Sequence, residues 1–281
     1  MNILTVDVEE WFHLLDFDAT RSPREWENYE VRIYDNVEHL LQILEETNSR
    51  ATFFIIGWVA KRYPDLVRRI AQRYQIGSHT MNHQLVWQQS PNEFRRDVVD
   101  SIHLLQDISG GPVECFRAPG FSIRKSELWA FDILREEGIR YDSSIFPTKG
   151  SHGGFPDFEQ LATDIIDFRR WAQSPHADTD KILEFPISHH CLLGKNVVFN
   201  GGGYFRLMPY SLIRKWSLQS GDYLLSYIHP RDLDAAQPML PGLPLSRRFK
   251  SYVGLKGAAA KLRQYLTDFH FTDIATAVGN N

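Results

Sequence analysis

Two histidines separated by three residues give the sharpest chemical signal in the chain. His79 and His83 lie in the run HTMNH, directly after Gly77 and Ser78. On one turn of a helix, residues four apart lie one above the other, so both imidazole rings can reach the same metal ion. Neutral imidazole suits zinc and other borderline transition metals. The pair alone is weak evidence for a metal site, because such a site also needs negative charge.

Carboxylates that can supply this charge follow the first apolar run of the chain. The sequence ILTV at residues 3–6 leads directly into Asp7, Glu9 and Glu10. Like charges this close repel one another, so the cluster needs a cation, a proton or exposure to solvent. Two histidines and one carboxylate leave a divalent ion with open positions for water and substrate. A second carboxylate can take a proton from that water, as in a hydrolytic site.

Three further motifs carry residues suited to acid–base chemistry. Arg117 lies in RAPGF, before a rigid turn, and an arginine can bind a carboxylate through two hydrogen bonds. His229 lies in YIHP and could act as a general acid, because histidine titrates near neutral pH. Asp142 lies in YDSS, where pairing with this histidine and capping of the following backbone have equal weight.

Strand-like and helix-like segments alternate along most of the chain. Runs of apolar and β-branched residues predict strands. These runs cover residues 3–6, 51–56, 113–117, 139–141, 182–187 and 223–229. Apolar residues at helical spacing predict helices. These helices cover residues 37–46, 64–74, 90–108, 126–137 and 255–269, with a capping box formed by Ser90 and Glu93.

The alternation predicts an α/β fold with a mainly parallel sheet. In such sheets and barrels, active sites gather at the carboxyl ends of the strands. Asp7, His79, Arg117, Asp142 and His229 each lie at or just beyond the end of a separate predicted strand. We therefore expect five distant segments to meet at one rim.

The remaining segments are expected to decorate a single domain spanning residues 1–281. Residues 147–180 are rich in Pro, Gly, His and Asp, which predicts a long insertion that could lie over the site. The glycines at 201–203 lack the continuation of a phosphate loop and are interpreted as a flexible turn that presents Tyr204 and Phe205. A helical tail is expected around residues 255–270.

Composition and charge exclude several classes of function. The 281 residues are 43% hydrophobic with a net charge of −4 and no basic block, which argues against a nucleic-acid partner. No apolar stretch approaches the roughly 20 residues of a membrane span. No signal peptide is visible, and Cys115 and Cys191 lack metal-type spacing, so a cytoplasmic location is expected. A homo-oligomer is left open.

Taken in order, DVE, HTMNH, RAPGF, YDSS and YIHP resemble the five motif regions of NodB-type polysaccharide deacetylases, the family-four carbohydrate esterases. The runs TVDVEEWFH and GGGYFRL look closest to the branch found beside bacterial exopolysaccharide and exosortase loci. The resemblance extends from about residue 3 to residue 230. It implies a distorted (β/α) barrel of about seven strands and a metal-dependent enzyme that removes an N-acyl group, foremost N-acetyl, from an amino sugar.

The resemblance also implies a role for each matching residue. Asp7 falls on the catalytic base, and Arg117 on the arginine that tethers it. The position of the carboxylate metal ligand falls on Glu9, with the adjacent Glu10 as an alternative. His79 and His83 fall on the two histidine ligands.

The acid side of the reaction is implied in the same way. His229 falls on the general acid, and Asp142 on its carboxylate partner. The family's oxyanion hole uses a main-chain N–H that would lie near Phe121. Trp11, Phe12 and Tyr204 are expected to offer apolar walls on which sugar rings stack.

This sequence departs from the family pattern in two places. The family usually has adjacent aspartates, whereas here Val8 separates base from ligand and the ligand is a glutamate. The fourth region lacks the familiar tryptophan, which bears on the acetyl-methyl pocket. Zinc is the expected metal, with Co²⁺, Ni²⁺ or Fe²⁺ as substitutes. The alternatives are an allantoinase-like amide hydrolase, a deformylase, and an inactive carbohydrate-binding protein.

Overall fold

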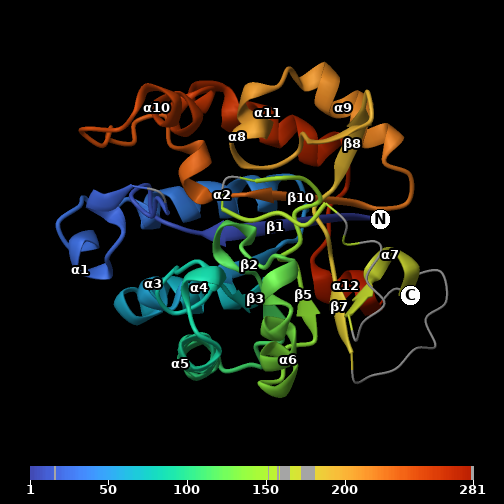
Figure 1. Ribbon diagram of the computed structural model, residues 1–281. Helices are drawn as coiled ribbons and strands as arrows, with labels where there is room; N and C mark the ends of the chain where they lie inside the picture. The colour runs from blue at the N-terminus through green and yellow to red at the C-terminus, as the bar shows by residue number, and fades with distance from the viewer. Residues whose placement is uncertain (16, 151, 157, 159–164, 172–180, 280–281) are drawn as a thin grey trace.

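A sheet of eight parallel strands forms the centre of the computed structural model (Figure 1), which describes residues 1–15, 17–150, 152–156, 158, 165–171 and 181–279. The order across the sheet is β10-β1-β2-β3-β4-β5-β7-β6. In chain order, these strands are β1 (Asn2–Val8), β2 (Thr52–Ile55), β3 (Gln75–Ser78), β4 (Cys115–Phe116), β5 (Tyr141–Asp142), β6 (Ile165–Asp167), β7 (Ile182–Glu184) and β10 (Leu224–Ile228). A separate antiparallel hairpin pairs β8 (His189–Leu192) with β9 (Lys195–Val198).

The sheet curls into a half-barrel with helices around it, which confirms the predicted distorted (β/α) barrel. Strand β6 adds an eighth strand at one edge, beyond β7. It belongs to the segment 147–180 that was predicted as an insertion, of which residues 151, 157, 159–164 and 172–180 lie outside the described residues.

The register of the strands brings the ends of distant segments together. The last strand of the sheet, β10, pairs with the first, β1, with Val6 opposite Ile228. Asp7 and His229 follow these two residues directly, so they become neighbours although 222 positions separate them. Ser78 lies opposite Phe116 in the same way, which places His79 beside Arg117. The predicted convergence at one rim follows from this register.

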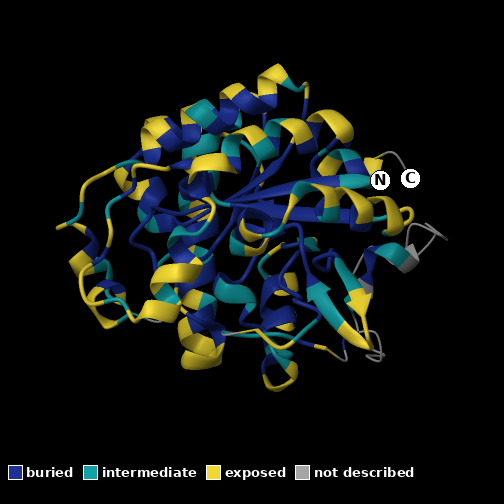
Figure 2. Cartoon of the chain, turned by 90° about the horizontal axis from the view of Figure 1, so that it is seen from above, coloured by how far each residue is buried: buried dark blue, intermediate teal, exposed yellow. Residues whose placement is uncertain are grey.

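Helices cover the outer faces of the sheet. They are α1 (Pro23–Trp26), α2 (Ile33–Glu46), α3 (Gly57–Arg62), α4 (Pro64–Ala71), α5 (Pro91–Ser109), α6 (Trp129–Glu136), α7 (Phe168–Trp171), α8 (Gly202–Leu207), α9 (Tyr210–Gln219), α10 (Leu245–Tyr252), α11 (Leu255–Asp268) and α12 (Ile274–Gly279). In Figure 1, α8–α11 lie above β1 and β10, α3 and α4 lie to the left of β3, and α5 and α6 lie at the bottom. Figure 2 shows buried strands at the centre and exposed residues on the outer helix faces.

Helix starts illustrate what local sequence can and cannot specify. Helix α5 begins at Pro91 with both halves of the predicted capping box, in which Ser90 and Glu93 satisfy each other's backbone N–H groups. Helix α2 begins at Ile33, four residues before the predicted start at residue 37. Its first N–H groups donate to the carboxylate of Glu10, at 2.9 Å for Ile33. A cap supplied from a distant segment leaves no signal beside the helix itself.

The glycine-rich run is helical rather than a flexible turn. Helix α8 spans Gly202–Leu207, and Phe205 is buried while Tyr204 is 43% exposed. At Gly201, a Cβ atom would lie 2.0 Å from Cε1 of Tyr227, so only glycine lets α8 approach the end of β10 this closely. The run therefore sets the position of α8 relative to the rim.

None of the helices within the described residues is long and apolar enough to cross a membrane.

Candidate functional site

Glu9, His79 and His83 form a compact cluster at the predicted rim. One oxygen of Glu9, Oε1, lies 3.3 Å from Nε2 of His79 and 2.9 Å from Nε2 of His83. All three side chains are at least nine-tenths buried. The prediction that these three residues meet is confirmed.

The donor atoms of this cluster fit a divalent cation. Nδ1 of His79 lies 2.7 Å from the carbonyl oxygen of Arg117, which can only accept, so Nδ1 carries the proton. In a neutral ring, Nε2 then directs a lone pair at the carboxylate of Glu9. Two acceptors facing each other need a cation between them or an additional proton. Two imidazoles and one carboxylate are a ligand set that zinc accepts.

Electrostatics favour the same protonation states. Burial raises the pKa of Glu9, but at acidic pH the protonated forms of His83 and His229 attract its carboxylate, and this effect outweighs burial and holds the pKa well below its ordinary value. Burial also lowers the pKa of His83, against the opposing effect of Glu9. An ionised carboxylate and a neutral imidazole are the forms that bind metals.

The two histidines meet through an irregular turn and not, as predicted, on a helix. Residues 79–83 contain no helix, and Thr80 and His83 have positive φ angles of 64° and 54°. Such angles are costly for residues other than glycine and persist where the surroundings hold them. Here Asp97 of α5 accepts hydrogen bonds from Met81 N at 2.7 Å and from Asn82 Nδ2 at 2.8 Å.

We expect Asp97→Ala to weaken metal binding by roughly 10- to 100-fold, because the buried carboxylate orients the turn that carries both imidazoles. Asp100→Ala, an exposed acid on the same helix, serves as the matched control. The measurement is competition for zinc against a chelator of known affinity. Equal affinities in the two variants would show that the turn holds its shape without Asp97.

Asp7 and Arg117 form a buried ion pair beside the cluster. Nη1 of Arg117 donates to Oδ1 of Asp7 at 2.7 Å, and the side chains are 0% and 4% exposed. The pair is joined through one oxygen, so Oδ2 of Asp7 stays available on the side of His229.

The rest of the guanidinium group of Arg117 is fixed by Ser143. Nε donates to the Ser143 carbonyl at 2.9 Å and Nη2 to its hydroxyl at 2.7 Å. The hydroxyl donates in turn to the carbonyl of Phe185 at 2.7 Å. The ring of Phe54 packs against the guanidinium at 4.5 Å. Arg117 is therefore held rigidly and orients the carboxylate of Asp7.

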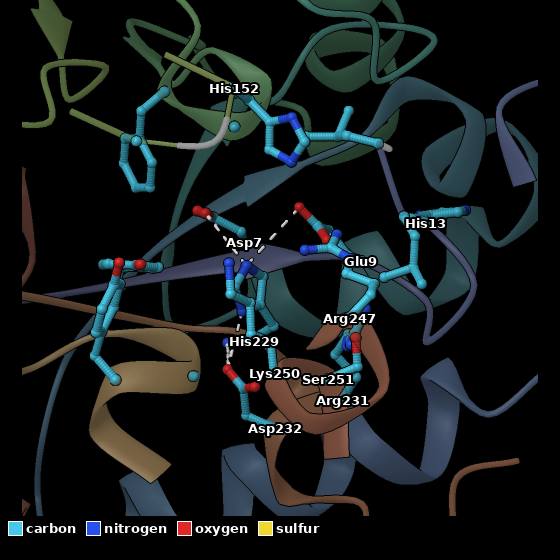
Figure 3. Close-up of a pocket in the computed structure, with 18 of the residues that line it drawn as sticks. Asp7, Glu9, His13, His152, His229, Arg231, Asp232, Arg247, Lys250 and Ser251 are labelled. Carbon is cyan, nitrogen blue, oxygen red and sulfur yellow. Dashed lines mark hydrogen bonds and ion pairs between the residues drawn. The ribbon is translucent and has the colours of Figure 1, made fainter. Parts of the chain in front are cut away.

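His229 faces both acids and is held from behind by Asp232 (Figure 3). Nε2 of His229 lies 3.8 Å from Oδ2 of Asp7 and 3.9 Å from Oε1 of Glu9, while Nδ1 lies 2.9 Å from Oδ2 of Asp232. Burial lowers the pKa of His229, but Glu9 and Asp232 raise it to about 9. The ring is therefore charged at neutral pH, with Nδ1–H donated to Asp232 and Nε2–H directed into the cavity.

Asp232 is itself fixed by a buried arginine. Its Oδ1 lies 2.9 Å from Nε of Arg206, and its Oδ2 also accepts the backbone N–H of His229 at 2.9 Å. Burial raises the pKa of Asp232, but Arg206 and His229 lower it below its ordinary value. A permanently ionised acid thus stands behind the histidine.

The predicted pairing of Asp142 with His229 is wrong. Asp142 instead accepts hydrogen bonds from the backbone N–H of Ser144 at 2.7 Å and from its hydroxyl at 2.8 Å, so the capping alternative holds. Burial and the negative charge of Asp142 raise the pKa of the neighbouring Glu184 well above its ordinary value. The carboxylate that the prediction sought is Asp232, on the short turn directly after His229.

The choice between Glu9 and Glu10 is settled by geometry. Glu10 points away from the histidines and accepts backbone hydrogen bonds from Arg32 at 2.7 Å and Ile33 at 2.9 Å. Burial raises the pKa of Glu10 to about 7, against the lowering effect of these bonds. Glu10 is thus a cap of α2, and Glu9 is the member of the cluster.

A cavity of about 500 Å³ opens above these residues, within the usual range for ligand pockets. Tyr204 and Phe121 line it, as predicted for substrate-binding residues. Trp11 does not, because it is 4% exposed and donates Nε1–H to the carbonyl of Glu30 at 2.9 Å. Phe12 is fully buried in the same separate apolar cluster. The predicted stacking roles of Trp11 and Phe12 are therefore wrong.

The predicted oxyanion donor is also engaged elsewhere. The N–H of Phe121 donates to the carbonyl of Ala118 at 3.0 Å, closing a tight turn in which Phe121 itself has a φ of 53°. Its ring packs against Tyr227 at 5.0 Å and Phe146 at 5.2 Å. Phe121 thus shapes the cavity wall through its side chain.

Several residues of the cavity were missed by sequence reasoning. They are His13, His152, Arg206, Arg231 and Asp232. Asp232 had a local signal, since an acid three residues after a histidine can hold its ring. His152 lies in the segment predicted as an insertion, and its place on the cavity wall depends on the path of the chain between distant elements.

Two family models match the chain in succession. Residues 16–140 match polysaccharide deacetylase, and residues 143–279 match a domain of unknown function (DUF3473). The boundary does not divide the sheet, because β5 and β7 pair across it. His229 and the wall formed by α8 and α10 come from the second match.

Curated relatives and a solved structure agree with the first match. The chain is 31% identical over 117 residues to a peptidoglycan-N-acetylglucosamine deacetylase of Bacillus cereus, covering 37% of this chain and 42% of that protein. It is 36% identical over 132 residues to a chitooligosaccharide deacetylase of Azorhizobium caulinodans, covering 46% and 60%. These matches thus span less than two thirds of each relative. A Mycobacterium smegmatis protein assigned to the polysaccharide deacetylases shares the fold, with a TM-score of 0.61 and 19% identity over 99% of this chain and 88% of that one.

Proposed function

Because the chain carries a polysaccharide deacetylase domain of the NodB/CE4 type, we propose that it is a metal-dependent hydrolase of N-acetylated amino sugars. The substrate would be a polysaccharide or its precursor, with N-acetylglucosamine as the first candidate sugar. The observation that carries the proposal is the cluster of two imidazoles and a carboxylate beside the ion pair of Asp7 with Arg117. We further propose that residues 1–281 act as one domain, because both family matches contribute to one sheet and one cavity.

In this proposal, Glu9, His79 and His83 would hold the metal, with zinc as the first candidate and Co²⁺, Ni²⁺ or Fe²⁺ as substitutes. When bound, a divalent ion supplies Lewis acidity, which polarises a carbonyl group and favours ionisation of water. The residues around it divide the proton transfers between them.

In this proposal, Asp7 acts as the general base. Arg117 holds Oδ1, so Oδ2 can take a proton from the attacking water while the water oxygen forms a bond to the amide carbon. Because Arg117 is itself held by Ser143, the oxygen that receives the proton is fixed in position. Preorganisation of this kind lowers the cost of reaching the transition state.

In the same proposal, His229 acts as the general acid. Its Nε2–H lies on the cavity side, next to Asp7, so the nitrogen of an amide bound in the cavity can receive this proton as the carbon–nitrogen bond breaks. One amide and one water are consumed, and one acetate and one free amine are formed. Tyr204, exposed on the cavity wall, offers an aromatic face for a sugar ring.

The pH dependence of this acid depends on Asp232. We expect Asp232→Asn to lower the pKa of His229, because the variant removes one of the negative charges that raise it. Activity requires the protonated ring, so the alkaline limb of the kcat profile should move to lower pH. Activity on that limb falls about tenfold for each unit of change in the pKa. An unchanged limb would mean that another group donates the proton.

The experiment that tests the proposed function is acetate release from N-acetylated oligosaccharides by the zinc-loaded protein. Release of acetate is the expected result. Release of formate from N-formyl sugars alone would indicate a deformylase, and hydrolysis of allantoin alone a non-sugar amidase. Sugar binding without release of any acid would contradict an enzymatic role and favour a carbohydrate-binding protein.

A further inference from the structure

One wall of the cavity is rich in cationic side chains that the proposed reaction does not use. In Figure 3, Arg231, Arg247 and Lys250 lie on the side of the cavity opposite His152. The net charge of the chain is −4, so this wall has the opposite sign of charge from the protein as a whole. Local fields of this kind select the charge of a ligand.

The acids of the cavity already have partners. Asp7 pairs with Arg117, and Glu9 lies between two histidines. Both oxygens of Asp232 are used, one by Arg206 and the other by His229. The carboxylates that line the cavity are therefore unavailable to neutralise the cationic wall.

Arg231 is the most unusual member of the wall. It is 7% exposed, yet it forms no ion pair with any of the residues that the structure describes. The adjacent Asp232 feels its charge, but both oxygens of Asp232 are paired with Arg206 and His229. Within the described residues, the side chain of Arg231 makes one hydrogen bond, from Nη1 to the carbonyl of Trp11 at 3.3 Å. Asp234, the first acid after Asp232 in the sequence, pairs with Arg32 at 2.5 Å between Oδ2 and Nε. A buried arginine without a counter-ion is rare and costly, unless a ligand provides the charge.

Lys250 extends the wall toward solvent. It is exposed on α10 and lines the cavity, and within the described part of the chain its ammonium group forms no ion pair. Its backbone carbonyl accepts a hydrogen bond from Nη2 of Arg206 at 2.9 Å, which fixes this part of α10 to the floor of the site. Two cations, one buried and one exposed, thus lead into the cavity.

We propose that Arg231, with Lys250 beside it, recognises an anionic oxygen group, a carboxylate or a phosphate, on the substrate glycan. This inference rests on the proposed deacetylase function and narrows its substrate class to acidic amino-sugar glycans. A guanidinium group presents paired N–H donors that match both kinds of anion. The anionic group of the ligand would then form the ion pair that Arg231 does not form with the described residues of the protein.

Binding measurements with three probes test the inference apart from turnover. The probes are neutral chitotriose, an N-acetylated trisaccharide that contains a uronic acid, and UDP-N-acetylglucosamine. Calorimetric titration uses the zinc-loaded Asp7→Asn protein, in which hydrolysis is suppressed. We expect one anionic probe to bind roughly tenfold more tightly than chitotriose, as a charge-assisted hydrogen bond allows. The anionic probe that does so identifies carboxylate or phosphate as the group recognised.

Three substitutions, each added to that protein, assign the preference to its residues. Arg231→Gln keeps a donor for the carbonyl of Trp11 but removes the charge, and should abolish the preference while leaving chitotriose binding unchanged. Lys250→Gln should reduce the preference in part. Arg248→Gln is the matched control, because Arg248 is exposed on the same helix but does not line the cavity. Thermal unfolding verifies that the Arg231 variant is folded.

The outcomes separate this inference from the proposed function. Equal affinity of the Asp7→Asn protein for all three probes would overturn the inference, even if the protein with native Asp7 releases acetate from chitotriose. An anionic preference that survives both Arg231→Gln and Lys250→Gln would overturn it as well. The opposite result is also possible. An anionic preference that is lost in Arg231→Gln would support the inference, even if the protein with native Asp7 releases no acetate and the deacetylase function fails.

Discussion

Replacing Asp7 with asparagine is expected to lower kcat/KM by roughly 10²- to 10⁴-fold, the usual contribution of a general base. The side chain keeps its shape, and the amide oxygen can still accept the hydrogen bond from Nη1 of Arg117. What the variant loses is the ability to take a proton from water. The assay is acetate release under saturating zinc, with metal content measured on the same sample.

The control for this variant addresses the buried arginine. Asp7→Asn leaves the charge of Arg117 uncompensated in a buried place, which costs stability. Ser143→Ala removes the hydrogen bond from Nη2 of the same guanidinium group but keeps the bond from Nε to the carbonyl of residue 143, so it should lose stability and far less activity than Asp7→Asn. Undiminished turnover in folded Asp7→Asn protein would refute the assignment of the base.

Replacing His229 with glutamine should reduce kcat by roughly 10²- to 10⁴-fold through loss of the proton donor. Against the lowering effect of burial, Asp232 helps to hold the pKa of His229 above its ordinary value, so activity should fall as the pH rises through this pKa. In the variant, the alkaline limb should disappear together with most of the rate. The measurement is a kcat profile between neutral pH and pH 10 or so.

A histidine outside the site provides the comparison. His103 is exposed on α5, and His103→Gln should leave both the rate and the alkaline limb unchanged. A His229→Gln protein that keeps its alkaline limb would show that the limb belongs to another group. A protein that keeps its rate would show that the leaving amine is protonated by solvent.

The site could be predicted from sequence where chemistry and strand order coincide. Asp7 lies near the end of β1, and His79 and Arg117 directly follow β3 and β4, so the register of the sheet brings them together. Their meeting therefore required only the rule that parallel strands end at one edge. The resemblance to a known family supplied the ligand set that spacing alone left open.

The predictions were wrong where the position of a residue depends on the direction of its side chain or on a partner from a distant segment. The four-residue spacing of His79 and His83 suggested a helix, yet the turn is irregular and is held by Asp97 from another segment. Trp11 lies two residues after Glu9 in the sequence but turns into a separate apolar cluster. Whether a residue beside a strand end faces the rim or the core is set by tertiary packing.

The pairing error at Asp142 has a similar cause. Asp142 ends a strand at the correct edge, but its carboxylate folds back onto the backbone N–H of Ser144. Asp232 lies three residues from His229 and needs no long-range contact to reach it. Local geometry therefore favoured Asp232, while the family pattern had pointed to the more distant residue.

The central claim is that Glu9 and the two histidines of the irregular turn hold a divalent ion. The direct test is the zinc content of chelator-treated, reconstituted protein, compared with that of Glu9→Gln and Glu10→Gln. Both substitutions remove one neighbouring carboxylate, but only Glu9 belongs to the cluster. We predict one zinc ion per chain in the unmodified protein and in Glu10→Gln, and far less in Glu9→Gln. Absence of zinc from the unmodified protein, or equal content in all three, would contradict the account.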